Sequence, residues 1–316
     1  MNIGRLARTL CLALAVLAPG IPQPLLGQTD PEGAITIGRA TDARACDATT
    51  MCATGRRIVS GQCGVVSDAA GREWTVPAEP ATGRTCANIY DDCNGPGVIE
   101  EYELESVVVD EGGAEITGVI HGDNYFELYV NGDYICRDPT AFIPFGVNAV
   151  RFTAQYPITY ALRLVDWEEH LGVGMEYERY NVGDGGVAAR FSDGTETDSE
   201  WRCQVFYIAP LDDRACVDES VAGQRMTGQC LDRPQCADRD PDQCQALHFE
   251  VPDDWTAPGF DDSGWPMAKV WPEDVVSPTG AYRELRERFA SAEFIWTDNL
   301  RIDNHVLCRV TVRAPE

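Results

Sequence analysis

Short segments of alternating hydrophobic and polar residues run through the C-terminal two-thirds of the chain, bounded by Gly, Asn, Asp and Pro. In one segment, Phe126, Leu128 and Val130 share one side of the alternation. Asn131-Gly132 follows directly. A period of two is typical of β-strands, and Asn-Gly supplies the left-handed residues that a type I′ turn requires. The pattern therefore predicts a hairpin whose return strand covers residues 134–136.

Three further segments show the same alternation. The first covers residues 158–164, the second 201–208 and the last 306–312. Several short strands at such spacing favour a β-sandwich. A short, charged segment at 282–290 is the one helix that we expect, so sheet should dominate this part of the chain.

The N-terminus has the order of an export signal. Arg5 and Arg8 precede a short apolar run at 10–18, which Pro19-Gly20 ends. This order is typical of a signal peptide, and the run is too short to span a bilayer. We therefore expect residues 1–27 to be a signal peptide, with an uncleaved anchor as the alternative, and a protein that is secreted or periplasmic. No later stretch reaches the roughly 18 apolar residues of a membrane helix, so no integral membrane segment is expected.

Thirteen cysteines are present, and one of them, Cys11, lies in the predicted signal. The remaining twelve form an even set, which in an exported chain predicts disulfides. Their pairing cannot be deduced from the sequence. No Cys-x-x-Cys occurs, which argues against a zinc ribbon or a thioredoxin-like redox site. The predicted disulfide cysteines are Cys46, Cys52, Cys63, Cys86, Cys93, Cys136, Cys203, Cys216, Cys230, Cys236, Cys244 and Cys308.

The cysteine spacing divides the mature chain. Residues 28–102 contain five cysteines and few apolar runs, which indicates a loop-dominated segment held by crosslinks. Five is an odd number, so at least one of these cysteines needs a partner outside, or stays unpaired. Residues 103–316 are expected to form the sandwich. Within them, 210–245 contains four cysteines and reads as an insertion that is crosslinked to itself.

The chain is strongly acidic, with 51 Asp and Glu against 25 Lys and Arg and a formal net charge of −26. Such a chain repels phosphate backbones, so no nucleic acid partner is expected. Acidic loops at Asp212-Asp213 and at 238–242 have the composition of Ca²⁺ loops but lack the glycine and terminal glutamate of an EF-hand. A structural Ca²⁺ is thus the one cofactor that we consider, with solvated loop acids as the alternative.

Four blocks follow one another in the C-terminal part. They are Asp123-Asn-Tyr-Phe-Glu-Leu-Tyr-Val-Asn-Gly132, Asp193-Gly-Thr-Glu-Thr-Asp-Ser-Glu-Trp201, Trp255-Thr-Ala-Pro-Gly-Phe-Asp-Asp-Ser-Gly-Trp265, and Phe294-Ile-Trp-Thr297 leading into Asp303-Asn-His-Val-Leu-Cys-Arg309. Together they resemble the galactose-binding-like jelly-roll module that accompanies catalytic domains in large extracellular glycosidases, such as bacterial rhamnosidases. The resemblance covers about residues 105–313. It implies an all-β jelly-roll β-sandwich, here with a cysteine-rich N-terminal segment and a cysteine-rich insertion.

The resemblance implies a binding protein and not an enzyme. We expect it to recognise carbohydrate or a cell-surface glycan, because indole rings stack on sugar rings while polar side chains bind hydroxyl groups. The candidate ligand-binding residues are Asp123, Asn124, Tyr125, Trp201 and Trp296. An Asx-turn for the Asp-Asn pair and a core position for each tryptophan are the structural alternatives.

Other functions stay open. Four histidines occur without the spacing of a metal motif, so metal ligands remain unknown, and a secreted copper- or calcium-binding protein that uses His121 and His305 is one alternative. A structural or adhesive surface protein is another. Acidic residues such as Glu168, Glu169 and Glu176 invite comparison with glycosidases, but a catalytic pair needs a fixed separation that the sequence does not establish. No Gly-x-Ser-x-Gly or phosphate-binding loop is present.

Overall fold

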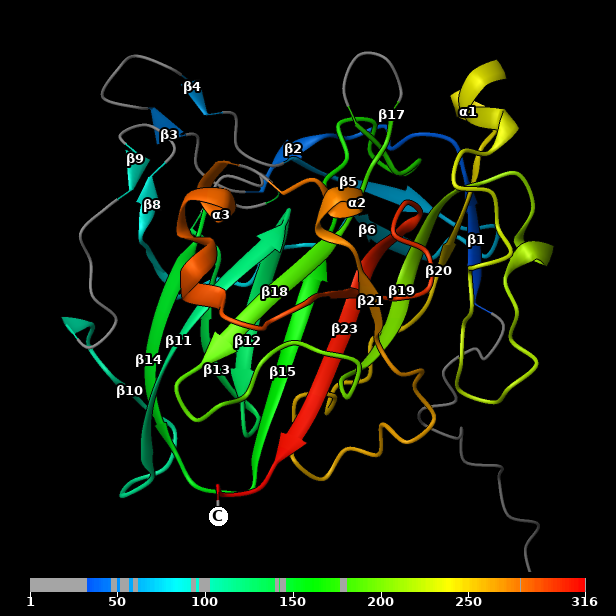
Figure 1. Cartoon of the computed structure of the whole chain (residues 1–316). Helices are drawn as coiled ribbons and strands as arrows, with labels where there is room; N and C mark the ends of the chain where they lie inside the picture. Colours follow the sequence, from blue (N-terminus) through cyan, green and yellow to red (C-terminus); the bar gives the residue numbers. More distant parts are fainter. Residues whose placement is uncertain are drawn as a thin grey trace, which may run out of the picture.

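The computed structural model describes residues 33–46, 50–51, 57–58, 62–91, 95–96, 103–139, 142, 146–176, 181–278 and 280–315. The structure is 42% strand and 11% helix, and the strands form two large and several small sheets, which confirms the predicted β class (Figure 1). The predicted signal peptide, 1–27, lies outside the described residues, as do Cys52 and Cys93. No helix among the described residues is long and apolar enough to cross a membrane.

Sheet I contains seven strands in the order β1-β20-β19-β23-β15-β12-β13, and all neighbours are antiparallel. Its strands are β1 (Ala34–Ile37), β12 (Tyr125–Val130), β13 (Asp133–Arg137), β15 (Ile158–Val165), β19 (Arg202–Leu211), β20 (Gln245–His248) and β23 (Asp303–Val312). The predicted strands at 158–164, 201–208 and 306–312 are therefore confirmed. The predicted hairpin is β12–β13, in which Asn131 and Gly132 both have positive φ, 50° and 93°.

Sheet II has the order β10-β14-β11-β18-β22-β21, and β7 also pairs with β14. Its strands are β7 (Ala87–Asn88), β10 (Val107–Val108), β11 (Ala114–Asp123), β14 (Asn148–Ala154), β18 (Gly186–Phe191), β21 (Lys269–Trp271) and β22 (Phe294–Trp296). Only β10 runs parallel to its neighbour, β14, among the described pairings of this sheet. Strands β1 and β7 come from the cysteine-rich segment, so this segment contributes one strand to each large sheet.

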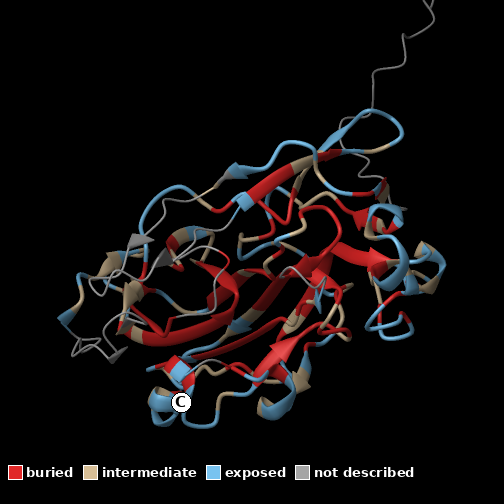
Figure 2. Ribbon diagram, turned by 90° about the horizontal axis from the view of Figure 1, so that it is seen from above, coloured by how far each residue is buried: buried red, intermediate tan, exposed pale blue. Residues whose placement is uncertain are grey.

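One hydrophobic core joins the two sheets. Leu128 and Tyr160 of sheet I and Phe152 and Phe191 of sheet II all belong to it. The ring centroids of Tyr160 and Phe191 lie 4.4 Å apart, so side chains from the two sheets are in direct contact. Buried residues follow the long strands, and exposed residues surround them (Figure 2). The arrangement is sandwich-like, as the alternating pattern predicts.

The outer face of sheet I is also covered. Strands β5 (Gln62–Ser67) and β6 (Glu73–Val76) pair with each other and pack on this face. Their residues Val66 and Val76 share a buried cluster with Tyr207 of β19. Sheet I is therefore buried on both sides, although its alternating sequence is typical of a sheet with one solvated face.

This cover explains a completely buried carboxylate on β12, the strand next to the edge of sheet I. Glu127 accepts hydrogen bonds from the Tyr125 and Tyr129 hydroxyls at 2.9 and 2.7 Å and from the Ala81 amide at 2.8 Å. The Arg163 guanidinium also pairs with this carboxylate, with Nη1 lying 3.2 Å from Oε1. Because a buried charge needs such partners, Glu127 fastens the cysteine-rich segment to the sheet.

Five disulfides join described cysteines: Cys46–Cys63, Cys86–Cys136, Cys203–Cys308, Cys216–Cys230 and Cys236–Cys244. One cysteine of the N-terminal segment thus reaches outside it, as the odd count predicts, through Cys86–Cys136. The four cysteines of the insertion pair with each other, which confirms that it is crosslinked to itself.

The remaining elements are short. The small strands are β2 (Arg44–Ala45), β3 (Thr50–Met51), β4 (Arg57–Ile58), β8 (Tyr90–Asp91), β9 (Gly95–Pro96), β16 (Met175–Glu176) and β17 (Asn181–Val182). The helices are η2 (Arg214–Cys216), α1 (Gln235–Arg239), η3 (Pro241–Gln243), α2 (Glu273–Val276), α3 (Gly280–Leu285) and η4 (Arg286–Phe289). The expected helix at 282–290 is thus formed by α3 followed by a 3-10 turn.

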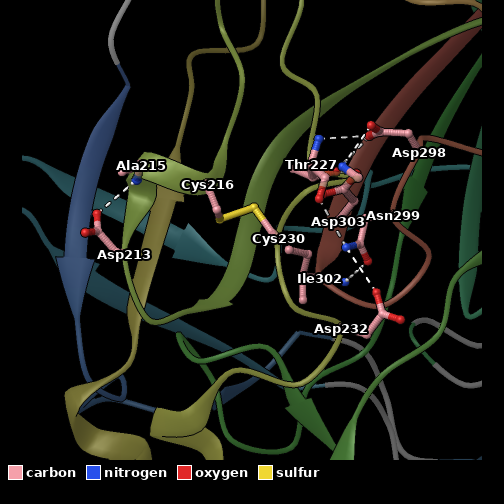
Figure 3. The surroundings of a disulfide bond; sticks show 11 residues. Asp213, Ala215, Cys216, Thr227, Cys230, Asp232, Asp298, Asn299, Ile302 and Asp303 are labelled. Atoms are coloured by element: carbon pink, nitrogen blue, oxygen red, sulfur yellow. Dashed lines mark hydrogen bonds between the residues drawn. A yellow bond between two sulfur atoms is a disulfide. The ribbon is translucent and has the colours of Figure 1, made fainter.

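The insertion is fixed to the start of β23 by Thr227 (Figure 3). The Thr227 hydroxyl lies 2.9 Å from Asp298 Oδ1 and 2.7 Å from Asp303 Oδ2. Asp298 also accepts hydrogen bonds from the amides of Thr227 and Gly228. The polar insertion is therefore held by hydrogen bonds and disulfides instead of by a core of its own.

Two of the disulfides close loops of very different length, so we expect them to contribute differently to the free energy of unfolding. Loop entropy assigns about 4 kcal/mol to Cys86–Cys136, which spans 50 residues, and about 2.5 kcal/mol to Cys236–Cys244, which spans 8. The double substitution Cys86→Ser with Cys136→Ser should therefore lower the free energy of unfolding more than Cys236→Ser with Cys244→Ser. Urea titration of both variants measures this, and an equal loss would contradict it.

Candidate functional site

All five residues that the sequence proposed as ligand contacts are buried. Their exposed fractions are 6% for Asp123, 3% for Asn124, 1% for Tyr125 and 0% for Trp201 and Trp296. The prediction of sugar stacking on the two indoles therefore needs correction, because neither ring offers a face to solvent. Trp201 donates from Nε1 to the carbonyl of Glu196 at 2.9 Å, and Trp296 donates to that of Asp303 at 3.0 Å. Both are core residues with their one polar atom satisfied.

The Asp-Asn pair has a structural role, but not as the Asx-turn that the sequence suggested, because the Asn124 side chain binds a backbone amide far along the chain. The Asn124 side-chain oxygen accepts from the Trp167 amide at 2.5 Å, and its nitrogen donates to Asp123 at 3.1 Å. Tyr125 points to the outer face of sheet I, where its hydroxyl binds Glu127. The structure thus separates these neighbours: the pair joins the ends of β11 and β15, and Tyr125 lies beneath the cysteine-rich segment.

The histidines do not converge. His121 donates from Nδ1 to the Gly146 carbonyl at 2.8 Å, His248 lies 2.8 Å from the Thr36 hydroxyl, and His305 accepts from Arg163 at 2.9 Å. Burial lowers the pKa of His121 to about 4 and that of His248 to about 3. Within the described ranges, no group of three or more His, Cys, Asp or Glu side chains is arranged to hold a metal ion.

The acidic loops considered for Ca²⁺ act as caps. Asp212 accepts from the amides of Gln235 and Cys236, both at 2.7 Å, at the start of α1. Asp213 accepts from the Ala215 amide and begins η2 (Figure 3). Their carboxylates satisfy backbone groups that a helix start leaves unpaired, so Asp212 and Asp213 are helix caps and not the solvated loop acids that the sequence offered as the alternative.

A surface groove of about 550 Å³ lies where β19 begins and β23 ends. It is lined by residues 193–196, Asp198, residues 200–202, Asp262, residues 309–313 and Pro315. Three of the four sequence blocks therefore meet here, although they are far apart in the chain. We call this feature the polar groove, because its lining is rich in carboxylates, hydroxyls and guanidiniums.

Arg309 forms the floor of the polar groove and is only 1% exposed. It pairs with Asp262 at 2.9 Å and donates to the carbonyls of Trp255 and Ala257. One guanidinium of β23 therefore holds the whole loop that precedes Trp265. The sequence shows the aspartate and the arginine but not that they meet.

The wall of the polar groove is held by a second set of contacts. Asp193 accepts from the Tyr156 and Tyr160 hydroxyls at 3.2 and 2.8 Å. The side chains of Glu200 and Arg313 are exposed and make no polar contact among the described residues. The groove thus combines a fixed frame with two charged groups that are open to solvent, and sequence reasoning missed both.

Four carboxyl groups gather at the opposite end of β23. This carboxyl cluster consists of Asp123 at the end of β11, Asp166 after β15, Glu176 in β16 and Asp184 before β18. A Cβ atom on Gly183 would clash with the Asp166 carboxylate, so that carboxylate lies against the turn that carries Asp184. Each acid looks like an ordinary strand-end residue in the sequence, and only the pairing of distant strands brings them together.

Burial raises the pKa of every member, and repulsion by neighbouring acids raises it further for Asp123, Asp166 and Glu176. For Asp166, burial is the largest cause and repulsion by Glu176 and Asp184 comes next. Glu176 reaches a pKa of about 8, again through burial first and then Asp184. Arg301 pairs with Asp184 at 3.0 Å and opposes the rise in the pKa of Asp184. With one guanidinium for four acids, the cluster keeps protons at neutral pH.

These shifts predict how stability depends on pH. From pH 6.5 upward the folded protein keeps carboxyl protons that the unfolded chain has lost. Burial lowers the pKa of His121, His248 and His305, so the unfolded chain binds protons there near pH 6.5 that the folded protein does not. This opposing contribution fades as the pH rises to 8, and the carboxyls with raised pKa outnumber these histidines. Stability should therefore fall from pH 6.5 to 8, by about 1.4 kcal/mol per pH unit for each carboxyl proton that the folded protein keeps. Glu168 and Asp303, with pKa values raised by burial to about 7 and about 8, act in the same direction.

The variant Asp166→Asn should flatten this decline, because it removes one acid and its repulsion from the others. Thermal unfolding measured at several pH values tests this, with Asp261→Asn as the control, since that carboxyl is fully exposed and its pKa is lowered by hydrogen bonds at Ser263. A wild-type melting temperature that is constant from pH 6.5 to 8 would contradict the prediction.

Comparison of the chain with protein-family models, with curated proteins and with solved structures gives no match.

Proposed function

We propose that this protein is an exported, non-catalytic binding protein with a jelly-roll fold, which recognises carbohydrate through the polar groove. The observation that carries the proposal is the meeting of three sequence blocks in one groove of about 550 Å³, a volume typical of ligand sites. The disulfides support export, because such crosslinks persist in oxidising compartments.

The order of the strands supports the jelly roll. Along the chain, β11 belongs to sheet II, β12 and β13 to sheet I, β14 to sheet II, β15 to sheet I, β18 to sheet II and β19 to sheet I. Successive strands therefore change sheets repeatedly, and their neighbours within a sheet are mostly not consecutive. This interleaving is typical of the double Greek key of a jelly roll.

The chemistry of the polar groove suits a ligand that carries many hydroxyl groups. Carboxylates accept and guanidiniums donate hydrogen bonds, and both are exposed here at Glu200 and Arg313. Among the lining residues the single aromatic ring, Trp201, is buried. Recognition would therefore rest on hydrogen bonds at the loops, without the stacking first expected, and affinity would be modest.

Several carboxyl groups that could take part in a glycosidase pair are committed to the fold, which supports a non-catalytic role. Glu168 is buried and accepts from the amides of Gly172 and Gly174 at 2.8 and 2.7 Å. Asp193 and Asp262 are occupied by tyrosine hydroxyls and by Arg309. A catalytic acid needs access to the substrate.

The proposal is tested by glycan-array binding followed by titration of the best glycan. Arg313→Gln and Glu200→Gln should each weaken binding by about tenfold or more, because a hydrogen bond to a charged group is worth about 1.5–3 kcal/mol. Arg239→Gln and Glu73→Gln make the same chemical changes at exposed positions outside the groove and should leave affinity unchanged.

An array without any binding would count against carbohydrate recognition and favour the structural or adhesive alternative. Binding that the two groove variants leave intact would place the glycan elsewhere on the protein. Hydrolysis of any bound glycan would contradict the non-catalytic role.

A further inference from the structure

A second cavity opens between the two sheets at their edge. Strand β13 is the edge of sheet I, and β10 is the edge of sheet II. Residues 84–88 cross from one edge to the other, because Thr85 bridges to Arg137 while β7 pairs with β14. The Cys86–Cys136 disulfide holds this crossing in place. Between the crossing and β10 remains a cavity of about 390 Å³, which we call the edge window.

The floor of the edge window is the hydrophobic core. Ile135, Ala149 and Val150 line it and are at most 4% exposed. Ile135 comes from sheet I and the other two from sheet II, so the window leads directly between the sheets. Leu104 and Val107 add apolar surface on the side of β10. An apolar group of a ligand could bury itself here without displacing hydrogen-bonded backbone.

Two polar groups at the edge window have unused binding capacity. The Ser106 hydroxyl is buried and has no hydrogen-bond partner among the described residues. A buried hydroxyl without a partner is costly. Arg84 is exposed, and its guanidinium makes one long hydrogen bond, 3.5 Å, to the Ile135 carbonyl. Neither group is explained by the packing of the fold.

The charge of Arg84 is unusual in this chain. Acids outnumber basic residues by 51 to 25. Within the described part of the chain, however, no carboxylate forms an ion pair with Arg84, and this includes Glu105 on the same rim. Arg151, across the window, is already paired with Glu115 at 2.7 Å. The rim therefore offers one guanidinium without a counter-ion beside an apolar opening.

We propose that the edge window binds a small amphipathic carboxylate, whose apolar chain enters between the sheets and whose carboxylate pairs with Arg84. The Ser106 hydroxyl donates a hydrogen bond to the same headgroup. A guanidinium and a carboxylate form a charge-assisted pair, and the apolar chain gains by leaving water. This site is separate from the polar groove and independent of carbohydrate binding.

Isothermal titration with decanoate below its micelle concentration tests the proposal. Wild-type protein should bind decanoate and should bind decylammonium at least about tenfold more weakly, because the cation cannot pair with a guanidinium. Arg84→Gln should weaken decanoate binding by about tenfold or more. Arg239→Gln is the matched control, since it removes an exposed guanidinium outside the window.

A variant that fills the edge window gives a second measurement. Ala87→Phe should abolish decanoate binding, and an unchanged melting temperature would show that the fold survives. If this variant does not fold, the Arg84→Gln comparison decides by itself, because that side chain is exposed. The proposal is overturned if decanoate does not bind, if Arg84→Gln binds it as tightly as the wild type, or if decylammonium binds equally well.

Discussion

The structure depends on the insertion of its last strand into the middle of sheet I. Strand β23 lies between β15 and β19 (Figure 1) and pairs with β15 over eight residues. The Cys203–Cys308 disulfide also joins it to β19. Its first residue, Asp303, anchors the insertion, and Arg309 near its end holds the polar groove. Because the centre of sheet I is made by the end of the chain, neither the core nor the groove is complete until β23 is in place.

Burial of sheet I on both faces explains why the sequence motifs turn out to be structural. The cysteine-rich segment covers the face that carries Glu127, Arg163 and His305, and each of these polar groups then needs a partner inside the protein. Residues that would be surface binding groups on a half-exposed sheet therefore become crosslinks between layers. The same cover buries Tyr125, so its hydroxyl binds Glu127 and its ring is not accessible to a sugar.

The sequence could predict local structure and could not predict what covers it. Alternation and Asn131-Gly132 identify the hairpin, because both depend on neighbouring residues alone. Burial of Trp201 and Trp296 depends on packing between sheets, which a period of two does not reveal. Asp166 and Glu176 look like solvated acids for the same reason, since only the pairing of distant strands places them together. The odd cysteine count did predict a contact between distant parts of the chain, because a cysteine in a disulfide needs a partner wherever that partner lies.

Arginine supplies all but one of the 25 basic residues, and this explains how so acidic a chain neutralises its buried carboxyl groups. Arg309 serves Asp262 and two carbonyls, Arg163 serves Glu127 and His305, and Arg301 serves Asp184 and the Gly183 carbonyl. A guanidinium suits this work, because its five donors in a fixed plane reach several acceptors at once. A lysine at these positions would satisfy fewer of them and would lose more hydration on burial. Where carboxyls exceed the guanidiniums that can reach them, as in the carboxyl cluster, protons must supply the remaining neutralisation. Charge balance in this protein is therefore local, and the net charge of the chain does not describe any single site.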